Sequence, residues 1–236
     1  MDSIQYNIFV SDPFPIFLVH PIFLVHSIVL YQEEKNMSDE CKEILKYYSG
    51  NHYKFINDFL LMDFENEFKK KHRHYDEPFC QDKIHKIDDC FGSTDIAQIN
   101  EDDDLFVYRG VKTRVNLQVG ESFLLKNYTS TSTNLGVARR FTSDSKKINA
   151  CCLYRLHLSK GIPYIDMKPF SKVKTEDEIL LPRNLIMTYI GDTTIRDITV
   201  NDFTITKLNE TAIDMSSSRS KSDTKSKNTT RKKNSI

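Results

Sequence analysis

Glycine is scarce in this sequence, and the glycines are too far apart to form the common nucleotide-binding loops. The chain of 236 residues has seven of them, at positions 50, 92, 110, 120, 136, 161 and 191. Neither GxGxxG nor GxxxxGK[ST] fits these positions, which excludes a Rossmann fingerprint and a P-loop. The HExxH and GxSxG signatures are also absent, which excludes the active sites that they mark. A nucleotide bound by this protein must therefore be held in another way.

Tryptophan is absent, and cysteine is too sparse to define a scaffold. The five cysteines are Cys41, Cys80, Cys90, Cys151 and Cys152. An odd number that includes an adjacent pair does not indicate a disulfide framework. No CxxC pair occurs, which excludes a zinc ribbon and a thioredoxin motif. We therefore expect reduced, buried cysteines.

Net charge is also lacking, although the two signs are unevenly distributed. The chain has 33 basic and 33 acidic residues, of which seven basic and one acidic lie in 216–236. The rest of the chain is therefore acidic, and we expect its folded body to bind no nucleic acid. Residues 213–236 are mainly Ser, Lys, Thr and Asn, a composition that predicts a disordered basic tail.

Residues 1–37 form an N-terminal extension that differs from the rest of the chain. The hexapeptide PIFLVH occurs at 15–20 and again at 21–26. The surrounding apolar run, 14–31, is nearly long enough to span a bilayer, which leaves a signal peptide or a membrane anchor open. Internal prolines and histidines, and the lack of basic residues before the run, instead favour a short duplication or an extension upstream of a start at Met37.

Helical patterns come first along the chain, and strand patterns follow. A hydroxyl and two acids at 38–40 predict a helix start. A second helix is predicted from apolar spacing over 53–64, ending in the lysines at 69–71, and a weaker helix and loop over 81–99. The expected strands are 105–109, 122–125, 128–133, 150–158, 162–165, 178–181, 187–190 and 203–208. Helices followed by strands indicate one α+β domain, over 38–212.

Three short segments carry residue types suited to catalysis. The first is Val107-Tyr108-Arg109-Gly110, with an arginine at the end of an apolar strand. The second is Tyr128-Thr129-Ser130-Thr131-Ser132, and the third is Glu176-Asp177-Glu178 before an apolar strand. Residues two apart share a face of an extended segment, so we expect Ser130 to project with Ser132, and Glu176 with Glu178. Two carboxylates on one face cost repulsion and desolvation, which makes them candidates for a functional site.

These three segments, in this order, resemble the arginine–serine–glutamate class of mono-ADP-ribosyltransferases, which includes clostridial-type exoenzymes and arginine-specific ectoenzymes. The likeness extends from about Ser38 to Leu208 and includes Tyr48-Ser49-Gly50, Tyr53 and Ile56-Asn57. The resemblance implies two small antiparallel sheets packed at a steep angle beside N-terminal helices, with NAD in the cleft between the sheets. It also implies NAD as the substrate, without a metal.

The resemblance implies a role for each site residue. Arg109 is expected to pair with the NAD phosphates, and Ser130 to orient the catalytic glutamate and line the ribose pocket. Glu178 is expected to stabilise the ribosyl cation and Glu176 to activate the acceptor. The resemblance also implies that Phe141 packs on nicotinamide. Asp144 stands where the class has a phosphate-binding arginine, so Arg140 or Lys146 is expected to replace that arginine. Phe170 is expected to be the exposed aromatic of a substrate-binding loop at 168–175.

The sequence predicts transfer of ADP-ribose to a protein, at an arginine, because Glu at the first position of the pair goes with arginine acceptors in that class. An NAD glycohydrolase and a catalytically inactive binding module on the same fold remain open. We expect a monomer that acts on a protein of unknown identity. Asn127-Tyr128-Thr129 is a glycosylation sequon on the active-site strand, which favours a cytosolic location over a secreted or anchored one.

Overall fold

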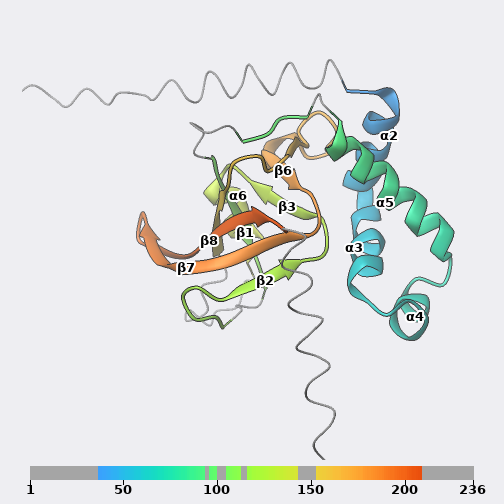
Figure 1. The fold of residues 1–236 in the computed structure, drawn as a ribbon. Coiled ribbons are helices and arrows are strands. Elements are labelled where there is room, and N and C mark those ends of the chain that lie inside the picture. The colour runs from blue at the N-terminus through green and yellow to red at the C-terminus, as the bar shows by residue number, and fades with distance from the viewer. Residues whose placement is uncertain (1–36, 94–95, 100–104, 113–115, 143–152, 209–236) are drawn as a thin grey trace, which may run out of the picture.

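The computed structural model describes residues 37–93, 96–99, 105–112, 116–142 and 153–208, which form a helical layer on one side of a sheet (Figure 1). The duplicated hexapeptide and the basic tail lie outside the described residues. So do Cys151, Cys152, Asp144 and Lys146, on which the sequence made predictions. Within the described residues, no helix combines the length and the apolar character that crossing a membrane requires.

The first helices begin where the sequence predicts but are divided differently. Helix α2 (Asp39–Tyr47) starts at Ser38, whose hydroxyl accepts a hydrogen bond from the amide of Cys41 at 3.2 Å. The sequence predicts one continuous helix from 53 to 71, and this prediction is wrong. It is divided into α3 (Tyr53–Leu61), the π-helix η2 (Phe64–Phe68) and α4 (Lys69–Lys71). The Asp63 carboxylate accepts from the amide of Asn66, and this new N-cap begins a separate helix.

Two further helical segments position the site. The π-helix η1 (Tyr48–His52) joins α2 to α3 through Asn51, whose φ of 149° changes the direction of the chain. Helix α5 (Glu77–Gly92) begins four residues before the weaker helix and loop predicted over 81–99, and it ends at Gly92. It begins earlier because Asp76 caps the amide of Phe79 at 2.8 Å and a proline occupies the first turn.

All the predicted strand regions within the described residues contain a strand. The strands are β1 (Leu105–Gly110), β2 (Ser122–Leu125), β3 (Thr129–Ser132), β4 (Leu153–Leu158), β5 (Ile165–Asp166), β6 (Glu178–Leu181), β7 (Leu185–Ile195) and β8 (Ile198–Lys207). Two short helices, α6 (Leu135–Arg140) and the 3₁₀ helix η3 (Lys174–Glu176), lie between strands. The α+β fold class predicted from the sequence is confirmed.

The strands form one hydrogen-bonded sheet in the order β2-β7-β8-β4-β1-β3-β6-β5. The expected division into two antiparallel sheets is therefore incomplete, because the pairing of Tyr108 with Ser132 joins β1 to β3. The pairing is also not antiparallel throughout, since β4 and β8 run parallel. Because β3 lies between β1 and β6, the three predicted site segments occupy neighbouring strands.

Two main hydrophobic clusters lie in the described residues. One joins the helices to β5, to β6 and to Tyr128, which directly precedes β3; it includes Tyr48, Ile56, Ile87 and Leu180. The other is formed by the sheet itself, around Val107, Leu156 and Phe203. The first cluster attaches the helical layer to the strands that carry the site.

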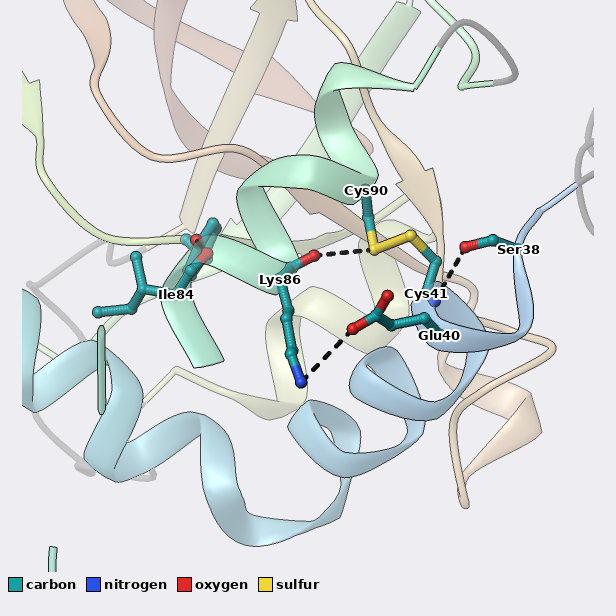
Figure 2. Close-up of a disulfide and its surroundings, with 7 residues drawn as sticks. Ser38, Glu40, Cys41, Ile84, Lys86 and Cys90 are labelled. Atoms are coloured by element: carbon teal, nitrogen blue, oxygen red, sulfur yellow. Dashed lines mark hydrogen bonds and ion pairs between the residues drawn. A yellow bond between two sulfur atoms is a disulfide. The ribbon is translucent and has the colours of Figure 1, made fainter. Parts of the chain in front are cut away.

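A disulfide between Cys41 and Cys90 joins α2 to α5 (Figure 2). The prediction that the cysteines are reduced is therefore wrong for this pair, whose Cα atoms are 5.6 Å apart. The packing of α2 against α5 brings together two cysteines separated by 49 residues. Cys80 is a free, buried thiol, as predicted.

Reduction of this disulfide is expected to destabilise the fold. For a loop of this length, loss of the cross-link lowers the free energy of unfolding by about 4 kcal/mol in the chain-entropy description. Urea denaturation with and without dithiothreitol measures the change. A Cys41→Ala/Cys90→Ala variant is the control, because dithiothreitol should have no further effect on it. An unchanged wild-type midpoint under reducing conditions would show that the cross-link does not stabilise the protein.

Candidate active site

The predicted arginine, serine and glutamates line one cavity of about 300 Å³. Arg109 comes from β1, Ser130 from β3 and Glu178 from the start of β6, while Glu176 ends η3. The helical layer and the segments after α6 and β5 supply the other walls. The remaining lining residues are Tyr48, Ser49, Tyr53, Asn57, Tyr108, Gly110, Tyr128, Thr131, Ser132, Val137, Ala138, Phe141, Ser171, Lys172 and Val173.

Arg109 is fixed against the neighbouring strand. Its Nη1 donates a hydrogen bond to the backbone carbonyl of Ser130 at 2.6 Å. Burial lowers the pKa of the guanidinium, while Tyr48, Tyr154 and Glu178 act in the opposite direction. Arginine nevertheless stays protonated in proteins, so Arg109 supplies a positive charge to the cavity. A guanidinium fork in this position suits phosphate oxygens.

Glu178 is a half-buried carboxyl group whose pKa is shifted by opposing effects. Burial raises its pKa above the usual value for glutamate, and Glu176 and Asp166 add to the rise. A hydrogen bond from the Ser130 side chain and the charge of Arg109 lower the pKa. The structure thus brings Ser130 to Glu178, as the sequence predicts.

Glu176 reaches the same cavity for a different reason from the one predicted. The strand begins only at Glu178, and Asp177 adopts a left-handed conformation with φ of 43° between the two glutamates. The backbone carbonyl of Glu176 accepts from Ser132 Oγ at 2.7 Å. The Asp177 carboxylate pairs with Lys168 at 3.3 Å and does not line the cavity. A turn therefore brings Glu176 and Glu178 together, rather than one extended strand.

Thr131 and Ser132 brace this part of the sheet. Thr131 Oγ1 donates to the carbonyl of Ile179 at 2.8 Å, and Ser132 is bonded to the turn at Glu176. Ser132 also accepts a hydrogen bond from the amide of Asn134, just before α6. Both side chains thus hold β3, the turn and α6 in a fixed relation.

Three aromatic and basic residues differ in how they relate to the cavity. Phe141 directly follows α6 and lines the cavity while its side chain is 53% exposed, which fits a residue at the entrance. Arg140 is exposed and is not a lining residue. The predicted exposure of Phe170 is wrong: it is 6% exposed in the helical cluster. Val173, 48% exposed, is instead the exposed apolar side chain of this loop that lines the cavity.

The helical wall adds site residues that the sequence analysis noted only as a likeness. Tyr48, Tyr53 and Asn57 line the cavity, and Asn57 Nδ2 donates to the Tyr48 hydroxyl at 3.2 Å. The Asn57 Oδ1 atom is buried and has no hydrogen-bond partner within the described parts of the chain. Tyr53 and Asn57 are four residues apart on α3, a spacing that places both on one face of the helix and could have been read from the sequence. No group of three or more His, Cys, Asp or Glu suited to a metal occurs within the described ranges.

Gly110 allows α6 and the following residues to lie directly on β1. A Cβ atom at this position would be 2.1 Å from the carbonyl oxygen of Ala138 and 2.9 Å from the amide of Thr142. Both are backbone atoms, so α6 would have to move. The glycine after Arg109 is therefore a packing requirement of the cavity wall.

Gly110→Ala is expected to displace Phe141, to destabilise the fold by roughly 1–3 kcal/mol and to raise KM for the substrate that occupies the cavity. Thermal melting and substrate titration measure these two effects. Gly92→Ala is the matched control, because a Cβ there meets nothing within 4 Å. Wild-type behaviour of Gly110→Ala would show that α6 can shift without affecting the cavity.

Comparison with known proteins identifies the family and the fold. The sequence model of the ADP-ribosyltransferase exoenzyme family matches residues 29–216. No curated protein sequence matches the chain. Among solved structures, the ADP-ribosyltransferase Vis of Vibrio splendidus, in complex with agmatine, is 17% identical with a TM-score of 0.56, covering 81% of this chain and 86% of that one.

Two other toxins are similar in fold. Plx2a of Paenibacillus larvae is 17% identical with a TM-score of 0.54, covering 79% of this chain and 94% of that one. The C3 exoenzyme of Clostridium limosum is 15% identical with a TM-score of 0.54, covering 78% of this chain and 93% of that one.

The fold and the site define an ADP-ribosyltransferase domain. The chain belongs to the ADP-ribosyltransferase exoenzyme family, whose members are transferases that use NAD.

Proposed function

We propose that this protein transfers ADP-ribose from NAD to an arginine side chain of another protein and releases nicotinamide. The observation that carries the proposal is the meeting of Arg109, Ser130, Glu176 and Glu178 in one cavity, although they come from three separate segments. Membership of the exoenzyme family supports NAD as the donor.

Each part of the cavity suits a part of NAD. Arg109 suits the diphosphate, because a fixed guanidinium binds two phosphate oxygens. The unpartnered Oδ1 of Asn57 is an acceptor for a hydroxyl or amide hydrogen of the ligand. Phe141 offers a flat apolar surface at the entrance, which suits an aromatic ring. These contacts would hold the nicotinamide ribose beside Glu178.

The chemistry follows from the charges. Cleavage of the N-glycosidic bond sends the bonding electron pair to nicotinamide and leaves a positively charged ribose. A fixed carboxylate beside that ribose lowers the barrier, and Glu178 is the carboxylate that Ser130 orients. Arg109 and Ser130 lower the pKa of this carboxylate and so oppose the effect of burial.

Glu176 fits the acceptor step. A guanidine nitrogen forms the new bond to the ribose carbon and gives up one proton. Free guanidinium is protonated at neutral pH, so it needs a carboxylate that binds it and accepts this proton. Glu176 is partly exposed in the cavity next to Glu178. The structure of Vis with agmatine, a guanidinium compound, supports an acceptor of this class.

The test is incubation of the purified protein with labelled NAD and agmatine, followed by measurement of nicotinamide and of ADP-ribosyl-agmatine. A parallel reaction with a cell lysate should label protein, and hydroxylamine should remove the label from an arginine linkage. NAD consumption without transfer would instead identify a glycohydrolase. Absence of nicotinamide release would identify a binding module and overturn the proposal.

A further inference from the structure

One buried tyrosine connects the cavity to an ion pair outside it. Tyr128 is fully buried. Its hydroxyl donates toward Asp88 Oδ1 at 2.7 Å and toward the carbonyl of Ile84 at 3.0 Å, both on α5. Asp88 also accepts from Arg183, whose Nε and Nη2 lie 2.9 Å and 2.7 Å from Oδ2. Arg183 lies in the turn between β6 and β7, so this network joins three elements.

The Tyr128 ring, held by this network, contacts Tyr48 in the cavity wall. It meets the ring of Tyr48 edge-on, with centroids 5.9 Å apart, and stacks with Phe91 at 6.1 Å. Tyr48 is fully buried and lies beside Asn57, Ser130 and Glu178. Burial raises the pKa of Tyr48, so this phenol stays neutral. A shift of Tyr128 would therefore move a neutral side chain that contacts the reacting part of the cavity.

The geometry of the ion pair favours a positioning role. Asp88 and Arg183 are each about 30% exposed, and a simple surface ion pair of that exposure contributes little to stability. Here the Nε atom of Arg183 contacts both carboxylate oxygens of Asp88, and its Nη2 atom contacts one of them. The same carboxylate accepts a hydrogen bond from the buried Tyr128 hydroxyl, and these contacts together fix its orientation. Neither Asp88 nor Arg183 lines the cavity.

We propose that Asp88 and Arg183 are positioning residues for the transfer reaction, which hold Tyr128 and, through its ring, Tyr48 in the wall of the NAD cavity. The inference rests on the proposed function, because it assigns these residues to the binding of NAD. A neutral wall residue makes the same contacts before and during bond cleavage, so its displacement weakens binding uniformly. The effect should therefore appear in KM for NAD, with little change in kcat.

The experiment measures kcat and KM for nicotinamide release by the wild type and by Asp88→Ala, Arg183→Gln and Tyr128→Phe, well below their melting temperatures. We expect KM for NAD to rise about tenfold in each, which corresponds to a loss of about 1.4 kcal/mol in binding. Tyr128→Phe keeps the ring and loses only the hydroxyl. Because both changes break the same contact, Tyr128→Phe/Asp88→Ala should raise KM no further than Asp88→Ala alone.

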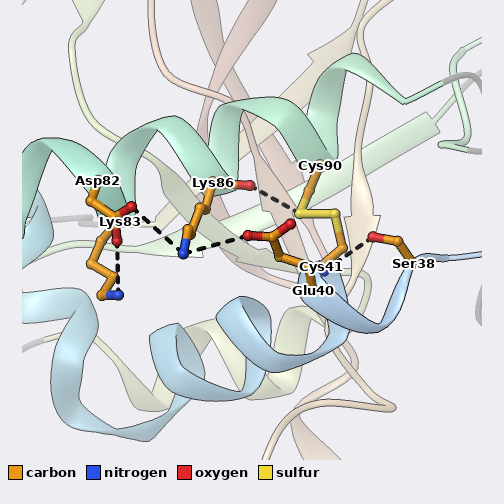
Figure 3. A network of polar contacts seen from close by, with 7 residues as sticks. All are labelled: Ser38, Glu40, Cys41, Asp82, Lys83, Lys86 and Cys90. Carbon is orange, nitrogen blue, oxygen red and sulfur yellow. Dashed lines mark hydrogen bonds and ion pairs between the residues drawn. A yellow bond between two sulfur atoms is a disulfide. The ribbon is translucent and has the colours of Figure 1, made fainter.

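Asp82→Ala is the matched control, because Asp82 lies on the same helix and pairs only with Lys83 and Lys86 among its described ion-pair partners (Figure 3). It should keep the wild-type KM. A purely structural role for Asp88 would reduce the folded fraction, which lowers apparent kcat and leaves KM unchanged. That result, or additive losses in the double variant, would overturn the inference. A wild type that releases no nicotinamide would instead overturn the proposed function.

Discussion

Replacement of Glu178 by glutamine is expected to lower nicotinamide release from NAD by roughly 100- to 1000-fold or more, the loss that follows removal of a main electrostatic contribution. The amide keeps the shape of the side chain and can still accept the hydrogen bond from Ser130. It removes the negative charge that opposes the ribosyl cation. Transfer to agmatine should fall by the same factor, because both reactions require cleavage of the same bond.

The same substitution should leave the protein at least as stable as the wild type. Burial raises the pKa of Glu178 above its ordinary value of 4.5, so the folded protein binds this proton more tightly than the unfolded chain does. The ionised carboxylate therefore costs stability above its folded pKa, and the cost disappears as the pH falls below its unfolded pKa. Glutamine removes the cost at neutral pH, as expected where function and stability oppose each other.

Two measurements check this prediction together. Nicotinamide release at saturating NAD gives kcat, and thermal melting at pH 7 and at pH 4 gives the stability difference between the variants. The wild-type rate should fall on acidification at a higher pH than an unperturbed glutamate would produce. Near wild-type kcat in Glu178→Gln would remove Glu178 from the mechanism. A large loss of melting temperature would mean that its role is structural.

The strand that carries each predicted site residue could be identified from local sequence. Arg109 ends an apolar run, and Ser130 and Glu178 lie in or at the start of short runs that form β3 and β6. The alternation and β-propensity of such runs are local properties. The meeting of these residues follows from strand order, in which β3 pairs with both β1 and β6. The resemblance predicted that meeting, whereas the spacing of the residues alone could not.

The errors concern features that depend on packing between distant segments. The disulfide required α2 to lie beside α5, and no local pattern distinguishes Cys41 and Cys90 from free buried cysteines. The resemblance implies an exposed Phe170, yet Met167 and the helical cluster bury this side chain. Asp88 and Arg183 are ordinary charged residues in the sequence, and their relation to Tyr128 appears only when α5 lies against the sheet.

The second large effect is expected for Glu176→Gln, which should separate transfer from hydrolysis. Transfer to agmatine should fall roughly 100-fold, the lower range for loss of a general base, while hydrolysis of NAD should change little. Water needs less assistance than a protonated guanidinium, and Glu178 still supports bond cleavage. The matched control is Asp177→Asn, because Asp177 pairs with Lys168 outside the cavity and asparagine tolerates its left-handed backbone.

The competing explanation is that Glu176 only maintains the turn before β6. The backbone carbonyl of Glu176, and not its carboxylate, accepts the hydrogen bond from Ser132, so the turn should survive loss of the charge. If Glu176 acted only through the turn, its substitution would lower both reactions equally, and Asp177→Asn would do the same. Nicotinamide release and ADP-ribosyl-agmatine formation are therefore measured side by side for both variants. Equal losses in the two assays would exclude the acceptor role, and unchanged agmatine transfer would exclude Glu176 as the residue that activates arginine.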